Sequence, residues 1–515
     1  MSGAASLTTT GSIRPRYGRR QRVFWFAEIT VGLLMLGTAV YSFVAYLTQS
    51  EGATSQLVVA IFSAYLFVEC RRYLMRTDAF GLLAPPLLAS IAHFLLNYLL
   101  PTAATTLDPW IHSRFEHYLW SMHEQIPYTL ILVGISAFSM WRGYYFGRRT
   151  AGVLRAQLVR WSVIRKRFEP HLAVAAAMQV GYLVVVSYAI SLGVFGISSS
   201  AQTREVNLAI LDYITLGMTA GALSFLLLMC HLFRRLETGK GVLGFRAAAI
   251  GIVFMHLVIA ALSGFKSQLV MPFVMLALAK FLVTRRISLA YIVSGVLALV
   301  LAYQVVEPFR AYLAREQLYG QSDIVSLFTG LQRSYEQRDL DSNSDVPLGT
   351  QIAQRFDLTA MAAIGIEFAD REQSAVSKAR EMRETLYLAP LLAYVPRALW
   401  PSKPLYETGG WFNTVVLGNP IGTSVGMGPQ AWLYLAGGIA GIVAGFFCIG
   451  WLQAILFDGF ARAGPGGIII FLAAANVLIL LPTEVGPSFV GILRILPIAF
   501  LAQFVLLRAP LARHR

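Results

Sequence analysis

The stretch LAVAAAMQVGYLVVVSYAISLGVFGI, residues 172–197, has 26 residues and no charged side chain. A helix of about 20 consecutive apolar residues is long enough to cross the hydrocarbon core of a bilayer. Similar runs recur along the 515-residue chain, in which charged residues make up only 13% and the mean hydropathy is +0.61. A soluble protein carries about 25% charged residues. The sequence therefore predicts an all-α polytopic membrane protein and excludes a disordered, fibrous or ordinary cytosolic one.

About twelve apolar segments are predicted to span the membrane. They lie at 24–47, 53–70, 79–100, 126–146, 172–197, 208–233, 245–263, 268–283, 287–306, 430–456, 467–482 and 488–507. The segment at 467–482 is short and is also compatible with a re-entrant helix. Three cysteines lie in or beside these segments without the spacing of a metal or redox motif, so no disulfide is expected.

The basic residues predict how the chain is oriented. Short segments on the N-terminal side of the membrane hold 26 Lys and Arg residues, whereas those on the other side hold only Arg114, Arg204 and Lys266. Short loops rich in Lys and Arg stay in the cytoplasm. We therefore expect both termini to be cytoplasmic and the first apolar segment to be an uncleaved span. The net charge of +15 is a topology signal here and does not indicate nucleic-acid binding.

One long hydrophilic segment separates the ninth and tenth spans. Residues 307–429 hold 11 Lys and Arg and 14 Asp and Glu, and long loops in compact proteins are usually functional. Helix-like patches predict a small, mostly helical domain outside the cytoplasm, with amphipathic segments resting on the bilayer. The chain then divides into a basic N-terminus (1–22), spans 1–9 (23–306), this loop domain (307–429), spans 10–12 (430–507) and a C-terminal tail (508–515).

The segment YVPRALWPSKP, residues 394–404, is the most distinctive part of the loop. Three prolines within nine residues fix a rigid, non-helical path. The backbone around Arg397 and Lys403 would therefore be nearly fixed, and little conformational entropy would be lost when these residues bind a ligand. Trp400 would stack on a sugar or bury at the membrane interface. The alternative is that this segment is an interfacial elbow that anchors the loop.

Other charged residues are expected at the same outer level of the membrane. They are Arg355 and Asp357 in an upstream patch, Glu307 and Arg310 after the ninth span, Lys266 in a tight turn, and Glu484 and Arg494 around the last span. An arginine within a span usually faces a bundle interior or a wet cavity. The structural alternatives are a snorkelling Lys266, an ion pair of Glu484 with Arg494, and solvated faces elsewhere. His93 and His256 are more often hydrogen-bonded core histidines than functional ones. Glu28 and Glu69, near the cytoplasmic ends of their spans, are expected to pair with neighbouring arginines.

These features resemble the Wzy-type O-antigen and oligosaccharide repeat-unit polymerases of bacterial envelopes. The resemblance is carried by Pro396-Arg397 with Trp400-Pro401-x-Lys403-Pro404, and by the Arg355 and Asp357 patch. It is supported by Gly428-Pro-Gln before the glycine-rich tenth span, by the Gly-x-Lys-Ser turn at 264–267 and by the long outer loop. The glycines of the tenth span are suited to tight helix contact. The resemblance in sequence covers about residues 245–460. Outside this range only the order of the membrane spans is similar.

The resemblance implies a metal-independent, GT-C-like glycosyltransferase without a cofactor in the bacterial inner membrane, its site facing the periplasm. The enzyme would transfer a growing glycan from undecaprenyl pyrophosphate to the non-reducing end of an incoming lipid-linked repeat unit. The product would be O-antigen, exopolysaccharide or capsule. A Wzz-like chain-length regulator and a Wzx-like flippase are implied as partners. No phosphate-binding loop, GxGxxG, HExxH or GxSxG motif is present, so ATP-driven transport is not expected.

The leaving undecaprenyl pyrophosphate is negatively charged. In the absence of a metal ion, guanidinium and ammonium groups would have to neutralise this charge. We assign pyrophosphate contact to Arg397, Lys403, Arg355 and Arg494, with Lys266 and Arg310 as second choices. Asp357, Glu307 and Glu484 are unranked candidates for the base that activates the acceptor hydroxyl. Two alternatives stay open. One is an O-antigen-ligase-like transferase, and the other is a secondary transporter or flippase of lipid-linked sugars.

Overall fold

The computed structural model describes most of the chain. The described ranges are 17–48, 52–113, 115–119, 121–196, 208–239, 243–263, 265–286, 288–315, 348–372, 374–395, 399–400, 403–404, 408–419 and 425–508, with residues 325, 329–330 and 332–333 between them. Within these ranges the regular elements are all helical, and an isolated β-bridge joins Pro170 to Leu507. The all-α prediction is confirmed for this part of the chain.

Long helices form the body of the molecule. They are α1 (Tyr17–Thr48), α2 (Ala53–Met75), α6 (Met122–Arg160), α7 (Leu172–Ser191), α9 (Leu208–Glu237), α10 (Leu243–Ser263), α11 (Lys266–Thr284), α12 (Leu289–Arg315), α19 (Gly428–Ala454), α20 (Pro465–Leu480) and α21 (Val485–Leu506). The third apolar segment is divided into α3 (Pro85–Ala89), a π-helical stretch (Ser90–Leu99) and α4 (Leu100–Ala104). Short connecting helices are η1 (Ala79–Leu83), α5 (Trp110–Ser113), η3 (Glu116–Tyr118), η7 (Ile455–Phe460) and η8 (Ala461–Ala463).

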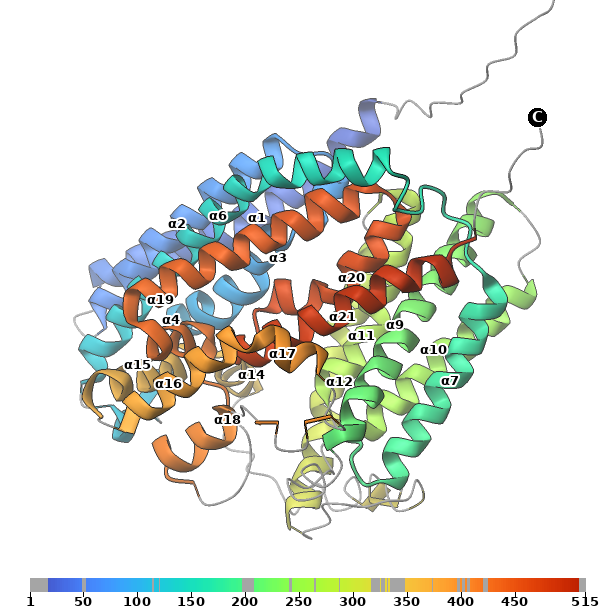
Figure 1. The fold of residues 1–515 in the computed structure, drawn as a ribbon. Helices are drawn as coiled ribbons and strands as arrows, with labels where there is room; N and C mark the ends of the chain where they lie inside the picture. The colour runs from blue at the N-terminus through green and yellow to red at the C-terminus, as the bar shows by residue number, and fades with distance from the viewer. Residues whose placement is uncertain are drawn as a thin grey trace, which may run out of the picture.

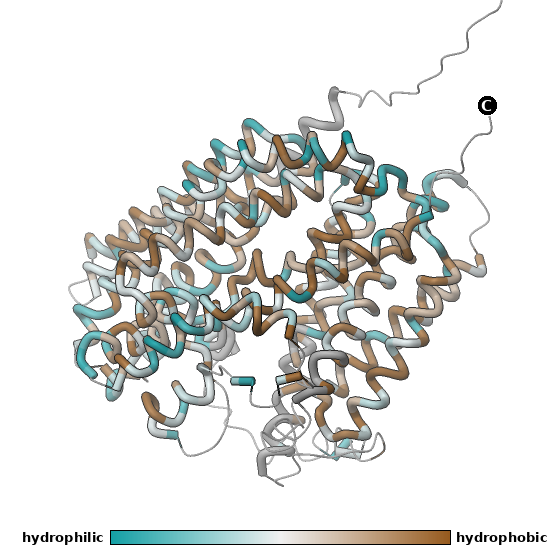
Figure 2. The backbone as a smooth tube through the Cα atoms, in the orientation of Figure 1, coloured by the Kyte–Doolittle hydropathy of each residue, from teal (hydrophilic) through white to brown (hydrophobic). Residues whose placement is uncertain are grey.

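Eight helices of the described ranges are long and apolar enough to cross a membrane. Shorter apolar helices cover Gln268–Thr284, Leu289–Val300 and Pro465–Leu480, and α6 coincides with the remaining predicted span. Large apolar side chains point outward along these helices, including Leu33 at 72% and Ile250 at 70% exposure, and hydrophobic residues recur along the long helices (Figure 2). A contiguous apolar surface of this kind needs lipid around it. The chain is therefore a multi-pass membrane protein.

The long helices fall into two groups (Figure 1). In the first group, α1 packs on α2, α2 packs on α6, and α6 packs on α19. In the second group, α7 packs on α9, α9 packs on α11, and α11 packs on both α10 and α12. Helices α20 and α21 pack on each other between the groups, with α20 in contact with both α3 and α9. The central pair therefore contacts both groups.

Glycine allows α6 and α19 to pack with their backbones in contact. A Cβ atom added to Gly143 of α6 would overlap the carbonyl of Phe447, and one added to Gly450 of α19 would overlap the carbonyl of Met140. Small residues at such positions are what permits close helix packing in membranes. The prediction that the glycine-rich tenth span makes a tight helix contact is confirmed.

Helix α19 is broken at two other glycines of the same span. Gly437 has φ −163° and ψ 22°, and Gly438 has φ 61° and ψ −153°. The positive φ at Gly438 lies in a region that side-chain-bearing residues rarely occupy. The carbonyl of Ala436, directly before the break, accepts a hydrogen bond from Arg383 Nη1 at 2.9 Å. Arg383 therefore stabilises the break from outside the helix.

The loop domain is helical where it is described, but it is less separate than the sequence predicted. Its elements are α14 (Leu348–Phe356), α15 (Thr359–Arg371), α16 (Ser374–Tyr387), α17 (Ala389–Tyr394), α18 (Thr408–Trp411) and a π-helical turn (Phe412–Val416). Helix α12 continues to Arg315, past the expected boundary at residue 306. Helix α15 packs on α6 and α19 and is buried from Thr359 through Glu367 except at Met361. Because this stretch is almost wholly apolar, α15 joins the bundle core and does not rest on the bilayer.

The acidic residues near the other end of the bundle pair with arginines, as the sequence predicted. Arg71 Nε lies 3.3 Å from Glu28, and Glu69 accepts from Arg72 at 2.8 Å and from Arg142 at 2.9 Å. Glu69 is 2% exposed, so its charge is compensated where solvent cannot reach it. We call this end, opposite α14–α18, the arginine-rich end.

Candidate functional site: two cavities beside helices α20 and α21

Two of the predicted pyrophosphate ligands converge on the C-terminal end of α17. Lys403 Nζ donates to the carbonyls of Leu392 and Val395, the latter at 3.0 Å. Arg494, on α21, donates from Nη2 to the carbonyl of Leu392 at 3.3 Å. The last carbonyls of a helix lack intrahelical partners and carry partial negative charge. The two cations are therefore close together, and both stabilise the end of α17.

Lys403 is held by the protein itself. The residue is only 7% exposed, and its described hydrogen bonds reach backbone carbonyls. Trp400 is half-buried. Its carbonyl accepts a hydrogen bond from the backbone N–H of Lys403 at 3.0 Å. Lys403 therefore fixes the path of the proline-rich segment, and its assignment to pyrophosphate contact stays a prediction. Arg397 lies outside the described residues.

Arg494 also borders a cavity of about 500 Å³, which we call the polar cavity. The cavity lies between α9, α10 and α11 on one side and α20 and α21 on the other. Its polar lining residues are Thr215, Thr219, His256, Ser263, Gln268, Asn476 and Arg494. Ligand sites of proteins are commonly cavities of this size, lined by apolar groups with a few convergent polar ones. An arginine inside a span therefore lines a cavity here, as the sequence predicted.

His256 is held in place at the wall of the polar cavity. Its Nε2 lies 3.0 Å from Oε1 of Gln179, and its ring stacks on Tyr182 at 4.8 Å between centroids. His93 is buried elsewhere, with Nδ1 3.1 Å from the carbonyl of Leu480 and Nε2 3.2 Å from Gln430. Both histidines are hydrogen-bonded in the core, which was the expected structural alternative.

A second cavity of about 570 Å³ lies on the other face of the α20–α21 pair, and we call it the apolar groove. The broken part of α19 forms one wall, through Leu433, Gly437, Gly441 and Gly445. Arg383 is the one charged residue among those that line the groove. Val477 of α20 and Ile492 of α21 line both the groove and the polar cavity. A single layer of side chains therefore separates the two cavities.

The candidate bases lie apart from each other. Asp357 is buried between α14 and α15, where Oδ1 accepts the backbone N–H of Thr359 at 2.9 Å and lies 3.4 Å from Nε2 of His112. Glu484 Oε1 accepts the backbone N–H groups of Thr408 and Gly409 at 3.0 and 2.7 Å. Both carboxylates therefore bind the starts of short helices. Glu484 and Arg494 bind different backbone groups, so the expected ion pair between them is not among their described contacts.

Four predicted site residues have a described backbone and an undescribed side chain. Lys266 begins α11, Glu307 and Arg310 lie on the C-terminal part of α12, and Arg355 lies on α14. Ser263 and Gln268, on either side of the Lys266 turn, line the polar cavity. The turn therefore lies at this cavity.

Two residues of the site were missed by the sequence analysis. Asn476 stands alone as an amide in the apolar α20, and a polar residue inside a span is a signal that could have identified it. Arg383 gave no such signal, because Arg380 on the same amphipathic helix looks identical in sequence. Only the broken end of α19 distinguishes the two arginines.

Comparison with known proteins identified no relative of this chain. No family model, no curated protein and no solved structure matches the chain.

Proposed function

We propose that the protein is a polymerase of undecaprenyl-pyrophosphate-linked oligosaccharide repeat units. The observation that carries the proposal is the pair of cavities on the two faces of α20 and α21, one bordered by Arg494 and the other by Arg383. A polymerase of this kind must hold two lipid-linked glycans at once, with their reacting sugars side by side. Two cavities that share the wall residues Val477 and Ile492 would hold two lipid-linked substrates close to each other.

The groove and the cavity suit different parts of such substrates. The apolar groove has room for a segment of a polyisoprenoid chain, and Arg383 lies where a phosphate attached to that chain would be. The polar cavity offers hydroxyl, amide and imidazole groups, which bind sugars, and Arg494 can neutralise a leaving pyrophosphate. Preorganised cations near a developing charge are a large source of catalysis.

The remaining assignments rest on the resemblance to Wzy-type polymerases. We propose twelve spans, cytoplasmic termini and a site that faces the periplasm of a bacterial inner membrane. Arg397, Arg355, Lys266 and Arg310 remain proposed pyrophosphate ligands. Asp357 is 4% exposed, which favours a structural role, so Glu484 and Glu307 are the better candidates for the base.

Metal independence is part of the proposal and needs its own test. The sequence contains an Asp-x-Asp pair, Asp339 and Asp341, which lies outside the described residues. Such a pair can hold a divalent cation. Polymerisation that continues in excess chelator supports the proposal, and full loss that is restored by Mg²⁺ or Mn²⁺ contradicts metal independence.

The proposed function is tested by glycan synthesis in nanodiscs that contain the purified full-length protein and a lipid-linked repeat unit. A ladder of products that differ by one repeat unit is the expected result. Arg383→Gln and Arg494→Gln should each lower the initial rate about 100- to 1,000-fold, the order of magnitude for losing one well-placed donor. Arg380→Gln is the matched control, because Arg380 lies on the same helix and pairs with Glu384 at 3.0 Å.

The outcome also separates the alternatives. Unchanged ladders in both Arg383→Gln and Arg494→Gln would contradict the proposed site. A single transferred glycan without a ladder would indicate the ligase-like transferase.

A transporter of lipid-linked sugars is the second candidate, favoured by the break at Gly437 and Gly438. Broken helices are a recurring feature of transporter binding sites. Movement of the lipid-linked repeat unit across liposomes, with no new glycosidic bond, would support this function and exclude polymerisation. A ladder without such movement supports the polymerase.

A further inference from the structure

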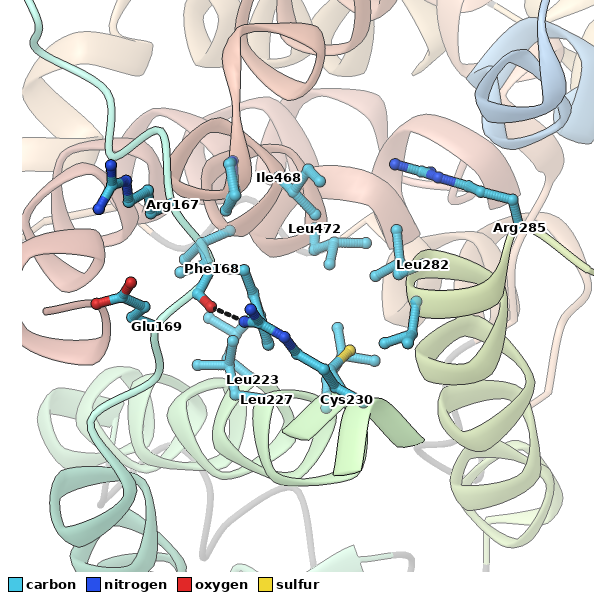
Figure 3. Close-up of a pocket in the computed structure, with 15 residues that line it drawn as sticks. Arg167, Phe168, Glu169, Leu223, Leu227, Cys230, Leu282, Arg285, Ile468 and Leu472 are labelled. Atoms are coloured by element: carbon cyan, nitrogen blue, oxygen red, sulfur yellow. Dashed lines mark hydrogen bonds between the residues drawn. The ribbon is translucent and has the colours of Figure 1, made fainter. Parts of the chain in front are cut away.

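A third cavity lies at the arginine-rich end of the molecule, away from the two cavities of the proposed site. It has a volume of about 560 Å³ and is bounded by the segment before α7, by α9, by the end of α11 and by α20. Figure 3 shows the side chains that line it. Because it shares only Leu472 with the polar cavity and no residue with the apolar groove, it needs an explanation of its own.

The rim of this third cavity is cationic. Arg167, Arg234 and Arg285 line it together with one acidic residue, Glu169. Three arginines and one glutamate give a net charge of +2. In Figure 3, Arg167 and Glu169 lie on one side of the cavity and Arg285 lies on the opposite side. In the same view the Arg167 side chain points away from the cavity, whereas that of Arg285 extends toward it. Arg285 is therefore placed to contact an anion in the cavity, and Arg167 adds positive charge at its edge.

The three arginines are not equally engaged by the protein. Arg234 Nη1 donates to the carbonyl of Phe168, as the dashed line in Figure 3 marks. Arg285 lies with its guanidinium carbon 4.9 Å from the ring centroid of Phe80. Burial lowers the pKa of Arg285 from its ordinary value, the nearby Asp78 raises it, and the positive charge of Arg462 lowers it. A bound anion would offset both the cost of burying the Arg285 charge and its repulsion by Arg462.

The floor of the third cavity is apolar. It is formed by Leu223, Leu226, Leu227, Ile468, Ile469 and Leu472. A free phosphate would gain nothing from these side chains, whereas an acyl chain would bury apolar surface against them at about 25 cal/mol per Å². The cavity therefore fits a molecule with a charged end and a hydrocarbon end.

We propose that this cavity binds an anionic phospholipid, with the phosphate at the Arg285 guanidinium and one acyl chain against the leucine and isoleucine floor. Basic pockets between transmembrane helices are suited to anionic head groups. Guanidinium groups bind phosphate through two parallel hydrogen bonds. The bound lipid would join α9, α11 and α20, and so would link the second helical group to the central pair. This inference does not depend on the proposed function.

The proposal is tested by lipid binding to the purified full-length protein, measured by native mass spectrometry. Phosphatidylglycerol is titrated against phosphatidylcholine with the same acyl chains. The wild type should bind one phosphatidylglycerol about tenfold more tightly than phosphatidylcholine. The double variant Arg167→Gln/Arg285→Gln should lose this preference, because it removes the guanidinium that the phosphate would contact and a second positive charge at the edge of the cavity.

Two further variants separate charge from shape. Arg149→Gln/Arg160→Gln removes two exposed arginines of α6 that do not line the cavity, and it should keep the preference. Ile468→Trp fills the apolar floor without changing the charge, and it should weaken the binding of both lipids. Circular dichroism and thermal unfolding confirm that each variant is folded, and Arg285→Gln alone replaces the double variant if that one is not.

Three results would overturn the proposal. The first is a lipid preference that survives Arg167→Gln/Arg285→Gln. The second is an equal loss in Arg149→Gln/Arg160→Gln, which would indicate diffuse surface attraction. The third is glycerol phosphate binding as tightly as phosphatidylglycerol, which would show that the apolar floor contributes nothing.

Discussion

The substitution Lys403→Met tests whether Lys403 holds the fold or the substrate. Methionine keeps most of the length and apolar volume of the side chain but removes the ammonium group. The structure shows that this group donates to the carbonyls of Leu392 and Val395. After the substitution, Leu392 keeps its hydrogen bond from Arg494, whereas Val395 loses the one from Lys403.

The expected cost follows from these two hydrogen bonds. A hydrogen bond to a charged group contributes about 1.5–3 kcal/mol, and a buried carbonyl left without a partner costs about 1–3 kcal/mol. Because one of the two carbonyls keeps a donor, we expect a loss of about 2–3 kcal/mol in the free energy of unfolding. In a helical protein of this size, such a loss corresponds to a decrease in Tm of about 2–4 °C.

The assay is thermal unfolding of the purified protein in detergent, followed by tryptophan fluorescence, in parallel with glycan synthesis by the same sample. Lys166→Met is the control, because Lys166 is exposed in the segment before α7. An unchanged Tm together with a lost product ladder would refute the structural reasoning and restore Lys403 as a pyrophosphate ligand. A decreased Tm with activity that recovers at lower temperature would confirm it.

Two further predictions concern other parts of the structure. Gly450→Ala should destabilise the protein by about 1–3 kcal/mol, because the new methyl group overlaps the carbonyl of Met140 and forces α6 and α19 apart. The control is Gly37→Ala, whose methyl group meets no atom within 4 Å and should have little effect on Tm. The Asp78 carboxyl, 3.0 Å from Arg462, has a pKa below its ordinary value of 3.8, because the hydrogen bond and charge of Arg462 outweigh the opposing effect of burial. Since the pKa is lowered by folding, Asp78 contributes stability above about pH 4 and loses it as the pH falls further. The Tm difference between wild type and Asp78→Asn should therefore shrink between pH 5 and pH 3, and a difference that grows over this range would contradict the assignment.

The sequence predicted several contacts correctly because they follow from local chemistry. Glu28 and Glu69 pair with arginines, since a carboxylate near a cluster of cations at a helix end has nearby partners. The glycine-rich tenth span packs tightly, since glycine in an apolar helix serves close backbone approach. His93 and His256 are hydrogen-bonded core residues, since a buried imidazole needs a partner.

The sequence was less informative about the site. Lys403 and Arg494 are 91 positions apart, and nothing in their spacing shows that both would donate to the carbonyl of Leu392. Asp357 looks like a candidate base, yet it is sealed between α14 and α15 beside His112. Helix α15 looks like part of a surface domain, yet it is buried in the bundle. In each case the deciding contact joins segments far apart in the chain.

The sequence by itself determined that this chain is a helical protein of many membrane spans, because the length of an apolar run and the need to satisfy backbone groups in lipid leave few other structures. It also determined which end of the bundle collects arginine. Only the tertiary structure decided where the cavities lie, because they form where α20 and α21 separate the two helical groups and where α19 breaks. The direction of a side chain toward a cavity or a carbonyl depends on the packing of helices from distant parts of the chain, which no local pattern encodes.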